Sequence, residues 1–467
     1  MKNRSLTLFK IGLMLFVLAG MEGAVAAEDK ALEQEALSLL TQYLRIDTTN
    51  PPGNEIRAAE FFKAIFDREG IESQVFESAP GRGNIYARIK GDGSKKAVVL
   101  MSHMDVVPVD RRHWSVDPFS AVIKDDYLWG RGALDVKGMG IVELMAMLAM
   151  KRQGVPLKAD IVFLGTADEE AGGAMGAGYM VREHFDLVRD AGLVLNEFGF
   201  ISEGDDGKAR YYGASPAEKA PFWLKLTATG TPGHGSSPRP DSAVLKLVEA
   251  LHRIAAYQTA LSVDPVAQKF YADIADLDPS PDKRERLKNL RASLQDPAFA
   301  ADFTRDLRNN ATVRNTISIT MLEGSNKVNV IPAEATAHLD VRLLPTQDPA
   351  LFLNDLRQVI ADDAIRIDIV LSFAPSASPT DTEFFKVLEG IAGELDPGVK
   401  VTTPLLTGFT DCHFFREKGI PCYGFIPFRL PAKELGGVHG NDERISLENV
   451  KFGTRTMVEI LRRLATQ

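Results

Sequence analysis

Apolar positions recur in two different rhythms along the first half of the chain. Residues 30–46 and 55–70 place apolar and charged side chains at helical spacing, and the turn "TTNPPGNE" separates the two stretches. Short apolar runs then alternate with helical stretches: "KAVVLMSHMDVVP", "ADIVFLGTADEE" and "AGLVLNEFG" predict strands, whereas "GMGIVELMAMLAMKRQG" predicts a helix. This alternation indicates a largely parallel sheet covered on both faces, with functional side chains at the carboxyl ends of its strands.

The pattern changes near residue 213. "KAPFWLKLTATG", "VRNTISITMLEG", "EATAHLDVRLLP" and "IRIDIVLSF" alternate like antiparallel strands, "DSAVLKLVEALHRIAAY" is an amphipathic helix, and residues 263–311 show short, charged helical patterns. The α/β pattern returns after residue 374. We therefore predict an α/β fold with a three-layer catalytic domain of residues 28–216 and 375–467, whose sheet is mostly parallel, and an inserted α+β lid of residues 217–374.

The first 27 residues have the pattern of a secretory signal peptide. Lys2, Arg4 and Lys10 are followed by the short apolar run "IGLMLFVLAG" and then by small residues. A membrane anchor is the less favoured alternative, because a span needs about 20 apolar residues. We expect cleavage near Ala26 or Ala27, a periplasmic or secreted protein, and no membrane attachment afterwards.

Composition and charge exclude several classes of partner. The chain has 467 residues, of which 45% are hydrophobic, and its net charge is −9. Removing the leader leaves 51 basic and 62 acidic residues, a net charge of −11, which argues against nucleic acid or an anionic membrane as partner. The chain has two cysteines, Cys412 and Cys422. They could pair in an oxidising compartment, but their spacing does not decide it.

Histidines and carboxylates stand at the ends of several predicted strands. His103 and Asp105 are two residues apart, so on a strand they share a face. Taken singly, His103 could be an ordinary satisfied histidine and Asp135 an ordinary turn or helix-cap residue. Together the set supplies imidazoles and carboxylates without thiolates, which suits Zn²⁺ in a hydrolytic site, or Mn²⁺ or Co²⁺. The set comprises His103, Asp105, Asp135, Glu169, Glu170, Glu197 and His439.

Motifs that span nearly all of the chain after the leader resemble the two-zinc exopeptidases of metallopeptidase clan MH. In family order they are "SHMDVVP", "WGRGALDVKG", "TADEEAGG", "NEFG", "GTPGHGSSP", "NVIPAEATAHLDVRLLP", "GFTDCHFFREKGIPCYGF" and "HGNDERI". The family includes aminoacylases, carnosinase-like dipeptidases, acetylornithine deacetylase, succinyl-diaminopimelate desuccinylase and Gly-X carboxypeptidase. Glu197 stands where several relatives have Asp, so the chain most resembles the branch of Gly-X carboxypeptidase and the secreted N-acyl-amino-acid hydrolases.

The resemblance implies a role for each residue of the metal site. It implies that Asp135 bridges two Zn²⁺ ions and that a cis peptide follows it, between Asp135 and Val136. It further implies that Asp105 supports His103 from behind and that Glu169 is the general base, whereas Asp168 is a turn residue or supports the site from outside. The remaining implied metal ligands are His103 and Glu197 at the first ion, and Glu170 and His439 at the second.

The resemblance also implies substrate contacts from the lid and from a later loop. His234 would stabilise the developing oxyanion, often across a dimer interface, so a homodimer is expected. Arg342 would bind a substrate carboxylate; the alternative is a surface arginine paired with Asp340. Asn329 is a second expected contact, and Gly408 and Thr410 could offer backbone and hydroxyl donors. Ordinary structural roles are expected for His113, Trp114, His184, His252 and His413.

These observations predict a secreted two-zinc hydrolase. Its substrate would be an N-acyl amino acid or short peptide with a free carboxylate, cleaved at an amide bond through a metal-bridging water and the base Glu169. One alternative is a dipeptidase or aminopeptidase-like activity that needs a free amine. A non-catalytic homologue is the other alternative, and it is disfavoured because every expected ligand and the base are present.

Overall fold

The computed structural model describes residues 29–466, and the predicted leader lies outside this range. The described chain forms two compact units, one made of the residues up to Ala209 together with those from Ile426 onward, the other of Arg210–Phe425. The second unit therefore contains the whole predicted lid together with flanking segments. Across the described residues, no helix is both long and apolar enough to cross a membrane.

The first unit is built on a largely parallel sheet, as predicted. Its strands lie in the order β1 (Glu72–Glu77), β2 (Gly83–Ile89), β6 (Ala159–Thr166), β3 (Lys95–His103) and β7 (Ala191–Glu203), and β16 (Cys422–Pro431) also pairs with β7. Strand β3 runs parallel to both β6 and β7, whereas β1 and β2 are antiparallel. The carboxyl ends of β3, β6 and β7 consequently meet at one edge of the sheet.

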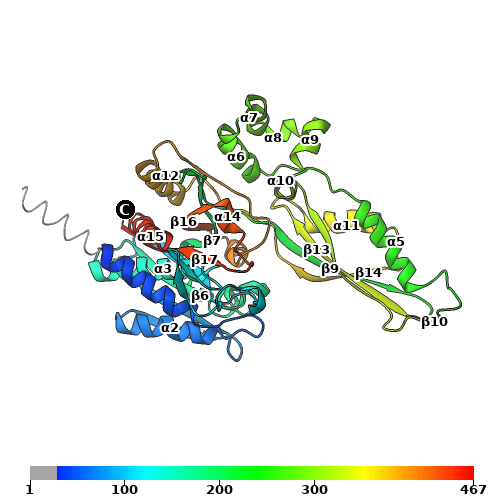
Figure 1. Cartoon of the computed structure of the whole chain (residues 1–467), viewed down its shortest axis with the longest axis horizontal. Coiled ribbons are helices and arrows are strands. Elements are labelled where there is room, and N and C mark those ends of the chain that lie inside the picture. Colours follow the sequence, from blue (N-terminus) through cyan, green and yellow to red (C-terminus); the bar gives the residue numbers. More distant parts are fainter. Residues whose placement is uncertain (1–28, 467) are drawn as a thin grey trace, which may run out of the picture. The chain divides into compact units, whose positions relative to one another are not determined.

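Helices pack against this sheet (Figure 1). Residues 29–44 are helical, and α2 (Glu55–Arg68), α3 (Lys137–Gln153), α4 (Ala177–Glu183), α14 (Ala432–Leu435) and α15 (Leu447–Thr466) complete the helices of the unit. Helix α3 is buried from Lys137 to Met150, which explains its nearly all-apolar sequence. A second, small sheet of the unit consists of β4 (Val122–Lys124), β5 (Tyr127–Trp129) and β17 (Arg444–Ser446).

The second unit contains an antiparallel sheet in the order β11 (Thr316–Glu323), β13 (Glu334–Leu343), β9 (Ala220–Thr229) and β14 (Arg366–Ser372). Helices α5 (Ala243–Ala256) and α11 (Pro349–Ile360) pack on one face of it, where alternate residues such as Leu224, Leu226, Leu339 and Val341 form the core. Because side chains alternate along a strand, the intervening Trp223, Asp340 and Arg342 lie on the opposite face.

Shorter elements complete the second unit. Helices α6 to α10 surround a separate small core around Tyr271, Leu290 and Phe303. Strands β8 and β15 pair in parallel, and β10 pairs with β12 in a two-stranded sheet. The bounds are α6 (Pro265–Ile274), α7 (Pro281–Lys288), α8 (Leu290–Ser293), α9 (Pro297–Phe303), α10 (Leu307–Thr312), α12 (Glu383–Leu395), α13 (Cys412–Arg416), β8 (Ala209–Gly213), β10 (Gly233–His234), β12 (Val330–Ile331) and β15 (Lys400–Thr402).

Candidate metal centre

Two overlapping groups of metal-ligating side chains lie at the carboxyl edge of the parallel sheet. One consists of His103, Asp135 and Glu197 and the other of Asp135, Glu170 and His439, and within each group the candidate ligand atoms lie within 4.8 Å of one another. Both groups contain Asp135, which therefore occupies the position of a bridge. The residues come from the end of β3, the β5–α3 turn, the turn after β6, strand β7 and the loop before β17.

Asp135 points one carboxylate oxygen at each histidine. Its Oδ1 lies 3.0 Å from His103 Nε2 and its Oδ2 lies 3.0 Å from His439 Nε2. Glu197 Oε2 completes the first group at 3.6 Å from His103 Nε2, and Glu170 Oε2 completes the second at 3.1 Å from His439 Nε2. The peptide bond after Asp135 is cis, which confirms that expectation.

The hydrogen bonds at His103 fit the binding of a cation. Its Nδ1 lies 3.0 Å from the backbone oxygen of Asp105 and donates to it, which leaves the lone pair of Nε2 facing two carboxylates. Such an arrangement of acceptors is stable only with a positive charge between them. Glu170 Oε1 is also buried, and none of the described residues offers it a hydrogen bond. The donor set of nitrogens and carboxylate oxygens suits Zn²⁺, Mn²⁺ or Co²⁺.

The pKa values of the same residues reflect this excess of negative charge. Burial alone would lower the pKa of His103, but the Glu197 carboxylate and three hydrogen bonds hold it well above its usual range. Hydrogen bonds to Asp135 and Glu170 raise the pKa of His439 to about 10. Burial raises the pKa of Glu170 to about 7. Protons thus take the place that a metal would occupy, so metal binding must release them.

Asp105 lies beside His103, as the resemblance implies, and it also holds the loop that follows β6. Strand β3 ends at His103, so the two residues do not alternate along a strand. Although Asp105 Oδ1 lies 3.4 Å from His103 Nδ1, its oxygens accept hydrogen bonds from the backbone nitrogens of Glu169 at 3.1 Å and Glu170 at 3.2 Å. The carboxylate therefore orients the loop that carries the two glutamates.

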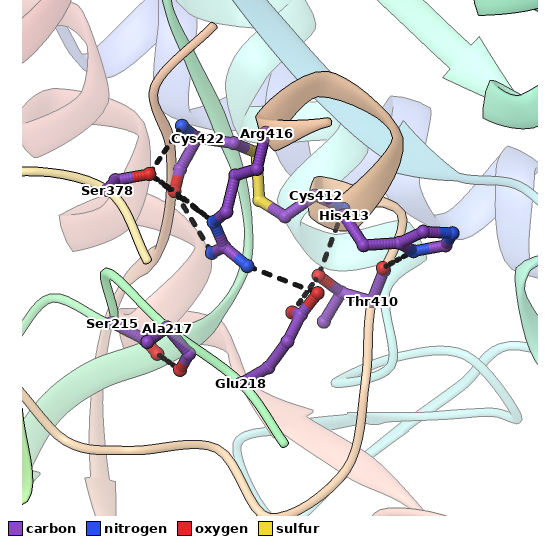
Figure 2. The surroundings of a disulfide bond; sticks show 9 residues. All are labelled: Ser215, Ala217, Glu218, Ser378, Thr410, Cys412, His413, Arg416 and Cys422. Carbon is purple, nitrogen blue, oxygen red and sulfur yellow. Dashed lines mark hydrogen bonds and ion pairs between the residues drawn. A yellow bond between two sulfur atoms is a disulfide. The ribbon is translucent and has the colours of Figure 1, made fainter. Parts of the chain in front are cut away.

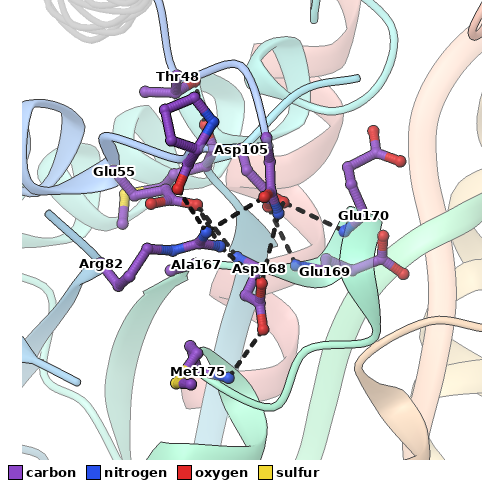
Figure 3. A network of polar contacts seen from close by, with 12 residues as sticks. Thr48, Glu55, Arg82, Asp105, Ala167, Asp168, Glu169, Glu170 and Met175 are labelled. Atoms are coloured by element: carbon purple, nitrogen blue, oxygen red, sulfur yellow. Dashed lines mark hydrogen bonds and ion pairs between the residues drawn. The ribbon is translucent and has the colours of Figure 1, made fainter. Parts of the chain in front are cut away.

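The acidic loop after β6 is held by Asp168 (Figure 3). Asp168 has φ of 71°, a left-handed conformation that Asp tolerates better than most residues. Its side chain accepts hydrogen bonds from Arg82 at 2.7 Å and from the backbone nitrogen of Met175 at 3.0 Å. The next residues, Glu169 and Glu170, begin a 3₁₀ turn (Glu169–Ala171). Asp168 thus fixes the start of the loop to Arg82 and its end to Met175.

Sequence reasoning missed Glu443, which shapes the turn that carries Asp135. Glu443 is fully buried, and its carboxylate accepts from the backbone nitrogens of Gly132, Leu134 and Asp135 at 2.9, 2.8 and 3.1 Å. Arg131 Nη1 lies 2.6 Å from its Oε2. Glu443 belongs to the quoted motif "HGNDERI", but no spacing rule connects it with a turn some 308 residues earlier in the chain.

His234 and Asn329 lie in the second unit, on facing segments. His234 pairs with Val330 in the two-stranded sheet of β10 and β12, and Gly235 N donates to Asn329 O at 2.9 Å. His234 is exposed, and its Nδ1 lies 2.7 Å from Ser236 Oγ. The ring therefore leaves Nε2 directed away from this contact.

Arg342 lies on the outer face of the β9–β13 pair, between aromatic rings. Its Nε lies 2.7 Å from Asp340 Oδ1, while its guanidinium carbon lies 5.8 Å from the ring centre of Trp223 and 5.2 Å from that of Phe409. Its Nη1 is buried and has no hydrogen-bond partner in the described part of the chain. The ion pair with Asp340 is thus present, and part of the guanidinium fork stays available to an anion.

The loop of Gly408 and Thr410 is braced by a disulfide (Figure 2). Cys412 and Cys422 are bonded, with Cα atoms 5.4 Å apart. Thr410 donates its hydroxyl hydrogen to Glu218 Oε2 at 2.8 Å, and Glu218 Oε1 lies 3.1 Å from Arg416 Nη1. A substrate would have to compete with Glu218 for the Thr410 proton, whereas no such bond occupies Gly408.

The other singled-out residues lie apart from the two ligand groups. His113 and His252 are exposed, and Trp114 is buried with Arg131 over its ring. His184 contacts Phe76 and Tyr179.

A protein-family model decides the family. The model of "Peptidase family M20/M25/M40" matches residues 99–463, well over half of the chain. The chain belongs to this peptidase family. It is therefore a metal-dependent hydrolase, and the resemblance drawn from its motifs is confirmed.

Relatives and solved structures extend this assignment. Over 452 residues the M20 chain is 28% identical to aminoacylase-1 of Sus scrofa, covering 95% of this chain and 98% of that one. It is 27% identical to the N-fatty-acyl-amino acid synthase/hydrolase of Mus musculus, covering 94% and 89%. The fold is similar to that of an M20 metallo-carboxypeptidase from Sulfolobus solfataricus, with TM-score 0.67, 21% identity, and coverage of 92% and 98%. A dinuclear metal binding peptidase of Bacillus subtilis has TM-score 0.56 at 14% identity, with coverage of 92% and 98%.

Proposed function

We propose that this chain is a secreted two-zinc hydrolase that cleaves an amide bond of N-acyl amino acids or short peptides with a free carboxylate. The observation that carries the proposal is the pair of ligand groups that share Asp135. The similarity to aminoacylase-1 and to an N-fatty-acyl-amino acid synthase/hydrolase supports the substrate class.

Each ligand group would hold one ion. Asp135 would contribute Oδ1 to the ion at His103 and Glu197, and Oδ2 to the ion at Glu170 and His439. Zn²⁺ fits the donors, and Mn²⁺ or Co²⁺ fits them as well. When bound, such ions supply a water of lowered pKa and polarise the amide carbonyl.

Glu169 would be the general base. It stands beside the ligand Glu170, and Asp105 fixes the backbone nitrogens of both residues. The residue is 8% exposed, so a carboxylate there is shielded from bulk water. Glu169 would take a proton from the attacking water and deliver it to the nitrogen of the leaving amine, a role in which a positioned carboxylate contributes about 10²–10⁴-fold.

The second unit would supply the remaining contacts. We assign Arg342 to the substrate carboxylate, since its Nη1 has no hydrogen-bond partner among residues 29–466. His234 would stabilise the oxyanion, across a homodimer interface, and Asn329 on the facing segment would contact substrate. Gly408 and Thr410 would contact the substrate carboxylate, with the backbone nitrogen of Gly408 as the more available donor.

The buried disulfide supports an extracytoplasmic location. Cys412 and Cys422 are fully buried or nearly so, at 1% and 0% exposure, and such bonds persist in oxidising compartments. The amino-terminal sequence pattern points the same way. A leader cleaved near Ala26 or Ala27 would deliver the protein to the periplasm or the medium.

A substrate panel tests the proposal. The protein would be stripped with EDTA, reloaded with Zn²⁺, Mn²⁺ or Co²⁺, and offered N-acyl amino acids and dipeptides with free or blocked ends. We expect metal-dependent hydrolysis that requires the free carboxylate. Turnover that needs a free amine instead would favour a dipeptidase. Glu169→Gln should lower kcat at least 100-fold with metal content unchanged, and retained turnover would remove Glu169 as the base.

A further inference from the structure

Arg82 lies between two buried carboxylates beside the metal centre (Figure 3). Its Nη2 is 2.9 Å from Glu55 Oε1 and 2.7 Å from Asp168 Oδ1. The Glu55 side chain is fully buried, and those of Asp168 and Arg82 are only 10% and 11% exposed. One guanidinium nitrogen thus ties helix α2 to the residue that precedes both catalytic-loop glutamates.

The second terminal nitrogen of the guanidinium, Nη1, reaches the same loop through Asn50 and Asp105. Arg82 Nη1 donates to Asn50 Oδ1 at 3.1 Å, which fixes the orientation of that amide because its oxygen is occupied. Asn50 Nδ2 must then point the opposite way, and it donates to Asp105 Oδ2 at 2.8 Å. Asp105 in turn receives the backbone N–H groups of Glu169 and Glu170.

The surrounding backbone leaves space for this guanidinium. Arg82 Nη1 also donates to Pro52 O at 3.0 Å. Gly53 has φ of +84°, and a Cβ at that position would lie 2.5 Å from Arg82 Nη1. The left-handed turn at Gly53 therefore both requires glycine and makes room for Arg82.

We propose that Arg82 is the positioning residue of the loop Asp168–Glu170, acting through Asp168 on one side and through Asn50 and Asp105 on the other. The roles of Glu169 as base and Glu170 as ligand rest on the proposed function; the positioning itself does not. Arg82 contacts neither the candidate ligands nor the base. Its guanidinium meets two carboxylates and the Asn50 amide oxygen in fixed directions, a task for a planar group with several donors rather than for a lysine.

Amide hydrogen exchange of the metal-free protein tests the positioning without any substrate. Arg82→Met is compared with wild type and with Arg88→Met, a matched control. Arg88, on β2, is also mostly buried, with 16% of its side chain exposed, and it pairs with Asp160 at the start of β6 and with Asp190 just before β7, at the opposite ends of these strands from the loop. We expect exchange at the amides of Glu169 and Glu170 to accelerate at least tenfold in Arg82→Met, and to stay unchanged in Arg88→Met. Equal exchange rates in all three proteins would overturn the proposal.

A second variant covers the case in which Arg82→Met does not fold. Asp168→Asn keeps the left-handed backbone and one oxygen for Arg82, but loses the second oxygen that receives Met175 N. It should accelerate the exchange of the Glu169 and Glu170 amides by a smaller factor than Arg82→Met does. In Arg82→Lys the exchange rates of these amides should lie between those of wild type and Arg82→Met. Unchanged exchange in Asp168→Asn would contradict the proposal.

Kinetics on an accepted substrate separates positioning from general destabilisation. Displacing a base by about 1 Å can cost about 100-fold in rate. Arg82→Met should therefore lower kcat about 100-fold with KM changed less than threefold, whereas Arg88→Met should keep both values. A KM effect with kcat retained would overturn the proposal. Finding no substrate would remove the proposed function but leave the exchange result standing.

Discussion

Replacing His413 by asparagine should remove a loss of stability that wild type suffers in acid. The imidazole is 3% exposed, its Nδ1 lies 2.8 Å from Thr410 O, and its ring stacks on Phe373 with centroids 3.5 Å apart. Its Nε2 is buried without a hydrogen-bond partner among the residues that the structure describes, so a second proton there would be unsolvated. Burial, reinforced by the charge of Arg416, lowers the pKa of His413 from 6.5 to about 4.

The size and sign of the effect follow from linkage. Between pH 6.5 and pH 4 the unfolded chain binds a proton at His413 that the folded chain excludes, so the free energy of unfolding falls as the pH falls through this window. The gap between the two pKa values corresponds to about 3 kcal/mol. Above pH 7 both states carry a neutral ring and His413 makes no pH-dependent contribution.

Urea unfolding at several pH values between 4 and 7.5 measures this loss. His413→Asn keeps a side-chain donor for Thr410 O but cannot titrate, so it should lose about 3 kcal/mol less stability than wild type across the window. His252→Asn, which changes an exposed histidine on α5, is the control and should follow wild type. Parallel curves for wild type and His413→Asn, or an NMR titration of His413 near pH 6.5, would refute the reasoning.

Two further changes test the metal centre and the disulfide. Asp135→Asn should reduce bound metal at both sites, because Asp135 belongs to both ligand groups, whereas Glu197→Ala should reduce bound metal at one site. Metal analysis of the two purified variants compares the losses. Equal losses of metal in the two variants would contradict a shared ligand. Cys412→Ser combined with Cys422→Ser opens a loop with sequence separation 10 and should lower the free energy of unfolding by about 3 kcal/mol. Because the bond braces the loop of Thr410, KM should rise more than kcat falls, and an unchanged KM would contradict that bracing.

The amino-acid pattern predicted the α/β class and the chemistry of the site. Parallel strands bring their carboxyl ends to one edge, so residues at the ends of separate apolar runs could be grouped before any coordinates. Thus His103 ends β3, and Glu170 follows β6 by a few residues. The cis bond after Asp135 came from the resemblance alone, since no spacing rule implies it.

Tertiary structure decided how these side chains are held in place. The period of a strand put Asp105 on the same face as His103, but β3 ends at His103, and the Asp105 carboxylate, 3.4 Å from His103 Nδ1, also orients Glu169 and Glu170. Arg82 meets Asp168 across 86 residues of sequence. Periodicity reports which face a side chain occupies within one element, whereas these contacts join loops whose paths depend on the packing of the whole domain.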